Sequence, residues 1–251
     1  MPFIHSDIIK NVEWKSNCKI NLASSVDVWK VKISSEEKLS DLFLQMFNEE
    51  EKEKASRYHN EDDKQRYIFG RGALRFLLGK YLNKSADTIQ FTIGTDKKPL
   101  LNKNSGSDLH FNISHSGDFD LIAISDSEVG VDIEKINPDF SYKEILKSNF
   151  TKEEIDFIQD SLHPIEAFYL LWTRKESLVK ATSKGLTDNL NLISTLDGLF
   201  NDGDKILDSH DSWDIHSFKI EENYLGSVAC NMHTKTINFL NTSPLFFLET
   251  I

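Results

Sequence analysis

Two short blocks of the sequence place carboxylates inside otherwise apolar runs. Residues 130–134 (GVDIE) contain Asp132 and Glu134, and residues 172–180 (WTRKESLVK) contain Glu176 with lysines beside it. A buried carboxylate is costly unless another charge or a metal compensates it. Carboxylate oxygens are ligands that Mg²⁺ prefers, and Mg²⁺ in proteins is commonly completed by substrate phosphates. The blocks therefore suggest a divalent cation beside a phosphate-bearing ligand.

The spacing within each block decides which side chains share a face. Asp132 and Glu134 stand two residues apart in a predicted strand, so both leave the same face. Glu176 and Lys180 stand four residues apart on a predicted helix and share one stripe. An exposed acidic strand edge and an ordinary ion pair are the simpler interpretations. Lys175 falls within the apolar arc of this helix, so it either extends to solvent or meets phosphate.

A polar turn follows another predicted strand. In residues 112–118 (NISHSGD) the Ser114 hydroxyl, the His115 imidazole and free backbone N–H groups converge, and such turns bind anions. A turn-capping serine and an incidental histidine are the alternatives. Lys98 and Pro99 also follow a strand, where the proline stiffens the chain beside a positive charge.

The elements that carry these residues follow from hydrophobic periodicity. Residues 26–33 alternate strictly and predict a strand, and residues 62–83 predict the clearest helix. A charged helix is predicted over residues 36–59. Further strands are expected at 89–93, 109–114, 121–124, 129–133, 213–220 and 225–230, and further helices at about 141–149, 152–160 and 164–182.

A faint internal repeat suggests two similar halves. Residues 113–124 resemble residues 215–229, and each of these predicted hairpins follows a long predicted helix. We therefore expect an α+β fold in which two similar α+β halves pack as an intramolecular pseudodimer, with residues 1–126 in one half and residues 127–251 in the other.

Composition excludes several classes of protein. Lys plus Arg is 29 and Asp plus Glu is 40, so the formal net charge is −11, which argues against a nucleic-acid binder. Cys18 and Cys230 fit neither a zinc site nor a disulfide framework. The N-terminal residues show no signal peptide, and no apolar run approaches the roughly 20 residues of a membrane span. A cytoplasmic protein that does not enter a membrane is expected.

The order of the motifs is more specific than any one of them. A basic helix, a Phe-Gly-Arg-Gly helix, Lys-Pro, Asn-Ile-Ser-His-Ser-Gly, Gly-Val-Asp-Ile-Glu and Trp-x-x-Lys-Glu-Ser-x-x-Lys follow one another within residues 50–187. This order resembles that of the large, pseudodimeric, Sfp-type 4′-phosphopantetheinyl transferases. The resemblance implies a Mg²⁺-dependent enzyme. It would transfer 4′-phosphopantetheine from coenzyme A to a serine of an acyl- or peptidyl-carrier protein and release 3′,5′-ADP.

The resemblance also implies roles for individual residues. Asp132, Glu134 and Glu176 would hold Mg²⁺ with the coenzyme A pyrophosphate. Glu176, Lys180 and Lys175 would form the catalytic set. The remaining implied contacts are Lys180 with phosphate, Ser114 and His115 with the nucleotide, Lys98 and Pro99 with the adenine, and Lys54 and Arg71 near the 3′-phosphate.

Two other functions are compatible with parts of this pattern. One is another Mg²⁺-dependent phosphotransferase, although no Walker A or kinase signature is present. The other is a coenzyme A-binding or carrier-docking module without catalysis, which the intact carboxylates and lysines argue against. The expected protein is a monomer. Its expected carrier surface is the docking segment, residues 140–165, unless the apolar side chains there are simply helix core.

Overall fold

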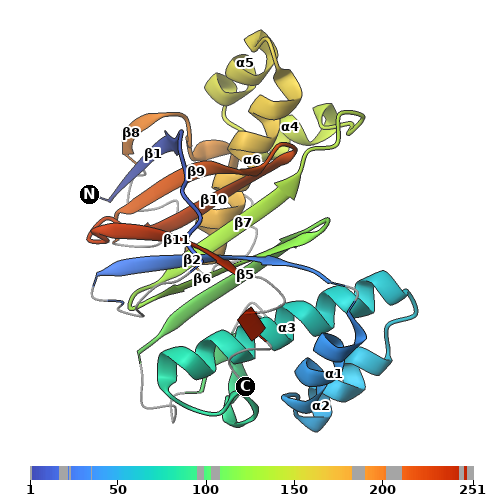
Figure 1. Cartoon of the computed structure of the whole chain (residues 1–251). Coiled ribbons are helices and arrows are strands. Elements are labelled where there is room, and N and C mark those ends of the chain that lie inside the picture. The colour runs from blue at the N-terminus through green and yellow to red at the C-terminus, as the bar shows by residue number, and fades with distance from the viewer. Residues whose placement is uncertain are drawn as a thin grey trace.

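The computed structural model describes residues 2–16, 22, 24–34, 36–94, 99–102, 108–182, 190–201, 211–242 and 246–247. Two β-sheets form its centre, with helix α3 packed on one and helix α6 on the other (Figure 1). The helices are α1 (Glu37–Gln45), α2 (Glu49–Ser56), α3 (Glu61–Leu82), α4 (Leu146–Asn149), α5 (Lys152–Asp160) and α6 (Pro164–Thr182), with short 3-10 turns at Ala86–Thr88, Lys143–Ile145 and Leu190–Leu192. The strands are β1 (Phe3–Ile9), β2 (Ser25–Lys32), β3 (Phe91–Ile93), β4 (Pro99–Leu101), β5 (His110–Ser116), β6 (Phe119–Ser125), β7 (Val129–Lys135), β8 (Gly198–Asn201), β9 (Trp213–Glu221), β10 (Tyr224–Asn231) and β11 (Thr236–Thr242).

The two large sheets share one pattern of pairing. One has the order β7-β10-β9-β1-β8 and the other β11-β2-β6-β5, while β3 and β4 form a separate hairpin. Strand β2, helix α3 and hairpin β5-β6 in the first half correspond to β7, α6 and β9-β10 in the second. In each half the last strand of the hairpin lies between the other two and is antiparallel to both. The predicted α+β class and the two similar halves are therefore confirmed.

The ends of the chain cross between these halves. Strand β1 runs parallel to β9 in the second half's sheet, whereas β11 runs parallel to β2 in the first half's sheet (Figure 1). If the chain were divided between residues 126 and 127, each sheet would contain one strand from the opposite half. That boundary stays a prediction, but the two sheets are interlocked and neither is built from one half alone.

The charged helix predicted over residues 36–59 is two helices. α1 ends at Gln45 and α2 begins at Glu49. Between them the Asn48 side chain accepts a hydrogen bond from the Glu51 backbone N–H, and the Glu51 side chain accepts one from the Asn48 N–H. This capping box starts a new helix. The prediction of one helix was wrong because charge composition does not show where a cap interrupts it.

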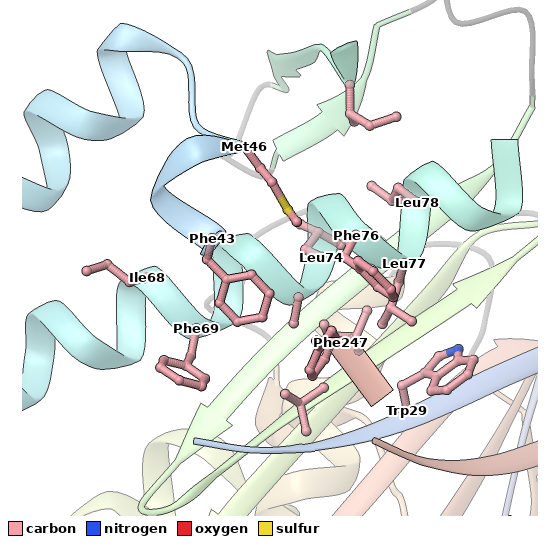
Figure 2. Packing of buried hydrophobic residues seen from close by; sticks show 14 of the residues in the cluster. Trp29, Phe43, Met46, Ile68, Phe69, Leu74, Phe76, Leu77, Leu78 and Phe247 are labelled. Atoms are coloured by element: carbon pink, nitrogen blue, oxygen red, sulfur yellow. The ribbon is translucent and has the colours of Figure 1, made fainter. Parts of the chain in front are cut away.

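Helix α3 carries one core of the molecule. Its apolar side chains pack with Trp29 of β2, with Phe43 of α1 and with Phe247 near the C-terminus (Figure 2). Gly72 permits this approach, since a Cβ at that position would lie 2.1 Å from the Phe43 ring. The core therefore holds α3 against the sheet that contains β5.

Helix α6 lies very close to strand β7. A Cβ at Gly130 would lie 2.0 Å from the carbonyl oxygen of Ser177 and 2.3 Å from the amide nitrogen of Ala181, so a larger residue cannot be placed there without moving backbone. Asp132 follows two residues later on the strand, and Lys180 lies on the facing turns of the helix. The glycine thus lets the two acidic blocks of the sequence approach each other.

Two predictions made from the composition concern membrane-spanning helices and the cysteines. No helix within the described ranges is long and apolar enough to cross a membrane. Cys230 is a buried free thiol, and burial raises its pKa to about 12, so it is unreactive at neutral pH. Cys18 lies outside the described residues.

Candidate active site

Strands β5 and β7 lie side by side, although they belong to different sheets. The Asn112 side chain on β5 accepts a hydrogen bond from the Val131 N–H at 2.9 Å, and Ser116 Oγ accepts one from the Lys135 N–H at 2.9 Å. Side chains of one strand therefore bind the backbone of the other. These bonds fix the register in which the polar side chains of the two strands meet.

Asp132 is the centre of this contact. Its buried carboxylate accepts hydrogen bonds at Oδ1 from Ser114 Oγ at 2.8 Å and from Lys180 Nζ at 2.6 Å. Burial raises the pKa of Asp132, and the Lys180 charge lowers it. Oδ2 is also buried and has no hydrogen-bond partner among the described residues. One oxygen of this carboxylate is therefore left for a ligand.

Glu134 and Glu176 are the other acids of this region. Burial, together with the negative charge of Asp132, raises the pKa of Glu134 to about 7, although the Ser116 hydroxyl donates to it at 3.1 Å. Burial and then the Asp132 charge also raise the pKa of Glu176. The ionised form of Asp132 thus opposes ionisation of both neighbours, and a cation among them would relieve this repulsion.

The three predicted metal ligands are electrostatically coupled, but they do not form a complete metal cage. Within the part of the chain that the structure describes, no group of three or more His, Cys, Asp or Glu side chains is placed to hold a metal ion. The donor set suits Mg²⁺ nevertheless, because it consists of oxygens and carries more negative than positive charge. The three-carboxylate Mg²⁺ site stays a prediction.

Lys175 is directed away from these acids. Its side chain is 1% exposed, and Nζ lies 2.8 Å from Glu154 Oε2 and donates to the carbonyl oxygens of Leu190 at 2.8 Å and Ile193 at 2.5 Å. Glu154 also accepts a hydrogen bond from the Thr195 N–H at 2.8 Å. This placement leaves no access to a phosphate, so the catalytic role expected for Lys175 is replaced by a structural one.

A cavity of about 290 Å³ lies on the other face of β5. Three of its side chains are lysine or arginine and a fourth is a histidine. Burial lowers the pKa of that histidine, His115, and the charges of Arg66 and Lys180 lower it further. The cavity is lined by Lys54 and Tyr58, by Asp63, Arg66, Tyr67, Gly70, Arg71 and Leu74 of α3, and by Pro99, Ile113, His115 and Asp120.

Aromatic rings and one carboxylate orient the cations of this cavity. Lys54 Nζ lies 4.9 Å from the centroid of the Tyr67 ring. The Arg71 guanidinium lies 4.4 Å from the centroid of the Phe91 ring, and its Nε is 3.3 Å from Glu51 Oε1. The cavity supplies the local basic pocket that an acidic protein needs to hold an anion.

The predicted nucleotide contacts divide between two places. Lys54, Arg71, Pro99 and His115 line the basic cavity, whereas Ser114 faces Asp132, because alternate residues of a strand point to opposite faces. Lys98 lies outside the described residues. Arg66, Ser116 and Asp120 also lie at these two places and were not predicted from the sequence. The alternation of β5 could have indicated Ser116, and a lone acid within the apolar strand β6 could have indicated Asp120.

The two halves match family models separately. Residues 128–230 match the 4′-phosphopantetheinyl transferase superfamily, and residues 32–127 match the N-terminal part of 4′-phosphopantetheinyl transferases. The chain is 31% identical over 206 residues to the 4′-phosphopantetheinyl transferase Sfp of Bacillus subtilis, a match that covers 80% of this chain and 88% of that protein. The chain belongs to the 4′-phosphopantetheinyl transferase superfamily.

Other relatives extend this result. The 4′-phosphopantetheinyl transferase HetI of Nostoc is 29% identical over 66% of this chain and 71% of its own length. The mouse L-aminoadipate-semialdehyde dehydrogenase-phosphopantetheinyl transferase is 29% identical over 75% of this chain and 68% of its own. A Synechocystis relative is 35% identical, and the match covers 61% of its length. The resemblance inferred from the motifs is confirmed: this phosphopantetheinyl transferase modifies carrier proteins.

Proposed function

We propose that this transferase binds coenzyme A across both faces of β5 and transfers 4′-phosphopantetheine to a serine of an acyl- or peptidyl-carrier protein. The main support for this proposal is the alternation of side chains between the two faces of β5. Ile113 and His115 line the basic cavity, whereas Ser114 and Ser116 donate to the acids of β7. Coenzyme A has a phosphorylated nucleoside for the first site and a pyrophosphate for the second.

In this proposal Asp132, Glu134 and Glu176 hold Mg²⁺ together with oxygens of the pyrophosphate. The bound cation would stabilise negative charge on those oxygens. Support comes from Asp132 Oδ2, which accepts no hydrogen bond from the described chain, and from the raised pKa values of all three acids. Lys180, already 2.6 Å from Asp132, would add a second positive charge.

The protein's own groups position the reactants and neutralise charge. The carrier serine hydroxyl attacks the β-phosphorus of coenzyme A, the bond from that phosphorus to the bridging oxygen breaks, and 3′,5′-ADP leaves. Phosphopantetheine is then joined to the serine oxygen. Glu176 suits acceptance of the serine proton, because burial and the Asp132 charge raise its pKa and so make it a stronger base than an ordinary glutamate.

One assay tests this function directly. Incubation with coenzyme A, Mg²⁺ and an apo carrier should raise the carrier's mass by one phosphopantetheine group. A gain of phosphate alone would indicate a different phosphotransferase. No gain with any carrier of fatty acid, polyketide or nonribosomal peptide synthesis would indicate a binding module. The same panel identifies the class of carrier that the enzyme serves.

Replacing His115 or Lys54 by alanine is expected to weaken recognition of the coenzyme A 3′-phosphate. Both side chains line the basic cavity, and hydrogen bonds to charged groups contribute about 1.5–3 kcal/mol. The KM for coenzyme A should rise about tenfold or more, while the KM for dephospho-coenzyme A changes much less. His110→Ala, at the opposite end of β5, is the matched control. Equal losses for both ligands would contradict the assignment.

The carrier surface is proposed on the docking segment, next to the helix that carries Glu176. Phe140, Phe157 and Leu162 are exposed there, with 41%, 45% and 94% of their surface accessible. Three other apolar residues of the docking segment, Leu146, Phe150 and Ile158, are buried in a core with α6. The proposed contact is therefore limited to the exposed side chains.

Aspartate in place of Phe157 or Leu162 is expected to raise the KM for the carrier about tenfold or more. Raising salt from about 0.05 to 0.5 M should change it only a few-fold, because screening acts on exposed charges and not on apolar contacts. Leu199→Asp on β8, where the side chain is 58% exposed, is the control and should leave this KM unchanged. If the KM for the carrier instead depends steeply on salt and neither aspartate variant changes it, charge selects the carrier.

We also propose that the protein is a cytoplasmic monomer. Both faces of β5 and both acidic blocks belong to one chain, and strands β1 and β11 interlock its two halves. No second copy is needed to supply a residue that the proposed chemistry uses.

A further inference from the structure

Asp120 on β6 is a fully buried carboxyl at the wall of the basic cavity. Its residue is 1% exposed, and neither of its oxygens has a hydrogen-bond partner among the residues that the structure describes. In the β5-β6 hairpin it stands directly opposite His115, so the two side chains share the face that lines the cavity. The proposed transfer chemistry at Asp132 makes no use of it.

Helix α3 has a glycine, Gly70, at the place where it packs against this carboxyl. A Cβ at Gly70 would lie 3.2 Å from Asp120 Oδ2 and 3.3 Å from Ile113 Cδ1, tighter than most real contacts. Glycine therefore leaves room for a polar group that a core position would normally exclude. An unpartnered buried carboxyl destabilises a fold, and such groups are expected mainly where a ligand completes them.

The surroundings of Asp120 determine its protonation. Burial raises its pKa to about 8, and the Arg66 charge opposes this shift only partly. At neutral pH the group is thus mainly a carboxylic acid with one O–H to donate. A carboxylate would repel any anion that Lys54, Arg66 and Arg71 attract, whereas the neutral acid adds a donor to the same site.

We propose that Asp120 donates a hydrogen bond to a phosphate held in the basic cavity. The inference rests on the proposed function, in which this phosphate is the 3′-phosphate of coenzyme A. Asp120 is then a recognition residue that distinguishes the 3′-phosphorylated nucleotide from its dephospho form.

The test measures binding of the free nucleotides by calorimetry, without metal or carrier. The probes are 3′,5′-ADP and 5′-AMP, which differ by the 3′-phosphate. Asp120→Val should weaken the binding of 3′,5′-ADP about 10- to 100-fold at pH 7, the range expected for a hydrogen bond to a charged group. It should weaken the binding of 5′-AMP no more than about threefold. Asp120→Asn retains an N–H donor and should stay within about threefold of wild type for both.

A pH series separates a proton donor from a space-filling group. Wild-type affinity for 3′,5′-ADP should fall as pH rises through about 8, because Asp120 then ionises beside the phosphate, while the Asp120→Asn affinity should not follow this fall. Both proteins keep the same other ionisable groups, so their difference isolates Asp120. The groups that face the cavity are Lys54 of α2, Tyr58 after it, Asp63, Arg66, Tyr67 and Arg71 of α3, and His115 of β5.

The outcomes are distinguishable. If wild type binds 3′,5′-ADP no better than 5′-AMP, the proposed use of this cavity fails and the inference with it. If wild type discriminates but Asp120→Val discriminates equally, the inference alone is overturned, and equal losses for both nucleotides overturn it too. Thermal melting checks that Asp120→Val is folded, and its midpoint should be no lower than wild type. If it does not fold, the comparison of Asp120→Asn with wild type across pH decides.

Discussion

Asp132→Ala is expected to abolish phosphopantetheine transfer while the protein stays folded. Asp132 binds Lys180 and Ser114 directly and, in the proposed function, supplies an oxygen to Mg²⁺. Loss of one preorganised electrostatic contact commonly lowers kcat by about 10² to 10³. Here one substitution removes a proposed metal ligand and the partner that orients Lys180, so a loss of at least about 100-fold is expected. The measurement is carrier modification followed by mass spectrometry.

The fold should survive this substitution, because it removes one of three mutually repelling acids. Without the Asp132 charge, the pKa of Glu134 should fall below its value of about 7. NMR titration of Glu134 therefore reports on the site independently of activity. Glu128→Ala removes an exposed acid just before β7 and is the matched control, expected to retain activity. Wild-type turnover by Asp132→Ala at ordinary Mg²⁺ would remove the metal-site assignment.

Lys175→Ala is expected to destabilise the protein by about 3–5 kcal/mol, the usual effect of removing one partner of a buried ion pair. Glu154 would remain fully buried with its charge no longer balanced. Burial also lowers the pKa of Lys175, because a charged ammonium group is costly in the protein interior. The negative charge of Glu154 acts in the opposite direction. Urea unfolding measures the change in free energy. Arg57→Ala, which breaks an exposed pair with Glu53, should cost less than about 1 kcal/mol.

Activity at low temperature, where the variant is still folded, separates the two roles of Lys175. A structural lysine predicts that turnover per folded molecule stays close to wild type. A catalytic lysine predicts the reverse, with normal stability and lost turnover. Glu154→Gln should repeat the loss of stability, because its effect passes through the same ion pair. Normal stability of both variants would contradict the structural role.

The case of Lys175 shows why part of the site could not be predicted from sequence. A lysine inside an apolar helical arc is visible as an anomaly, and a nearby phosphate is one reasonable explanation. Its real partners, Glu154 and the carbonyl oxygens of Leu190 and Ile193, lie on separate segments that meet only in the folded chain. Local pattern identifies the unusual residue, but tertiary packing decides what it pairs with.

The elements with strong local signals were predicted well. The strand at 26–33, the helix at 62–83 and the helix at 164–182 correspond closely to β2, α3 and α6, because strict alternation and long runs rich in apolar residues are local properties of the sequence. β1 and β11 were not predicted. Each is added to a sheet of the opposite half, and such pairing depends on contacts between distant parts of the chain.

The shared strand β5 has a further consequence for how this enzyme can change over evolution. The side chains at the odd-numbered positions 113 and 115 line the basic cavity, and those at the even-numbered positions 114 and 116 donate hydrogen bonds to the acids of β7. A point substitution can therefore alter one site and leave the other unchanged. A single inserted or deleted residue would exchange the two sets in one step, since it reverses which face every later side chain occupies. The two sites therefore constrain the length of this strand more tightly than its composition.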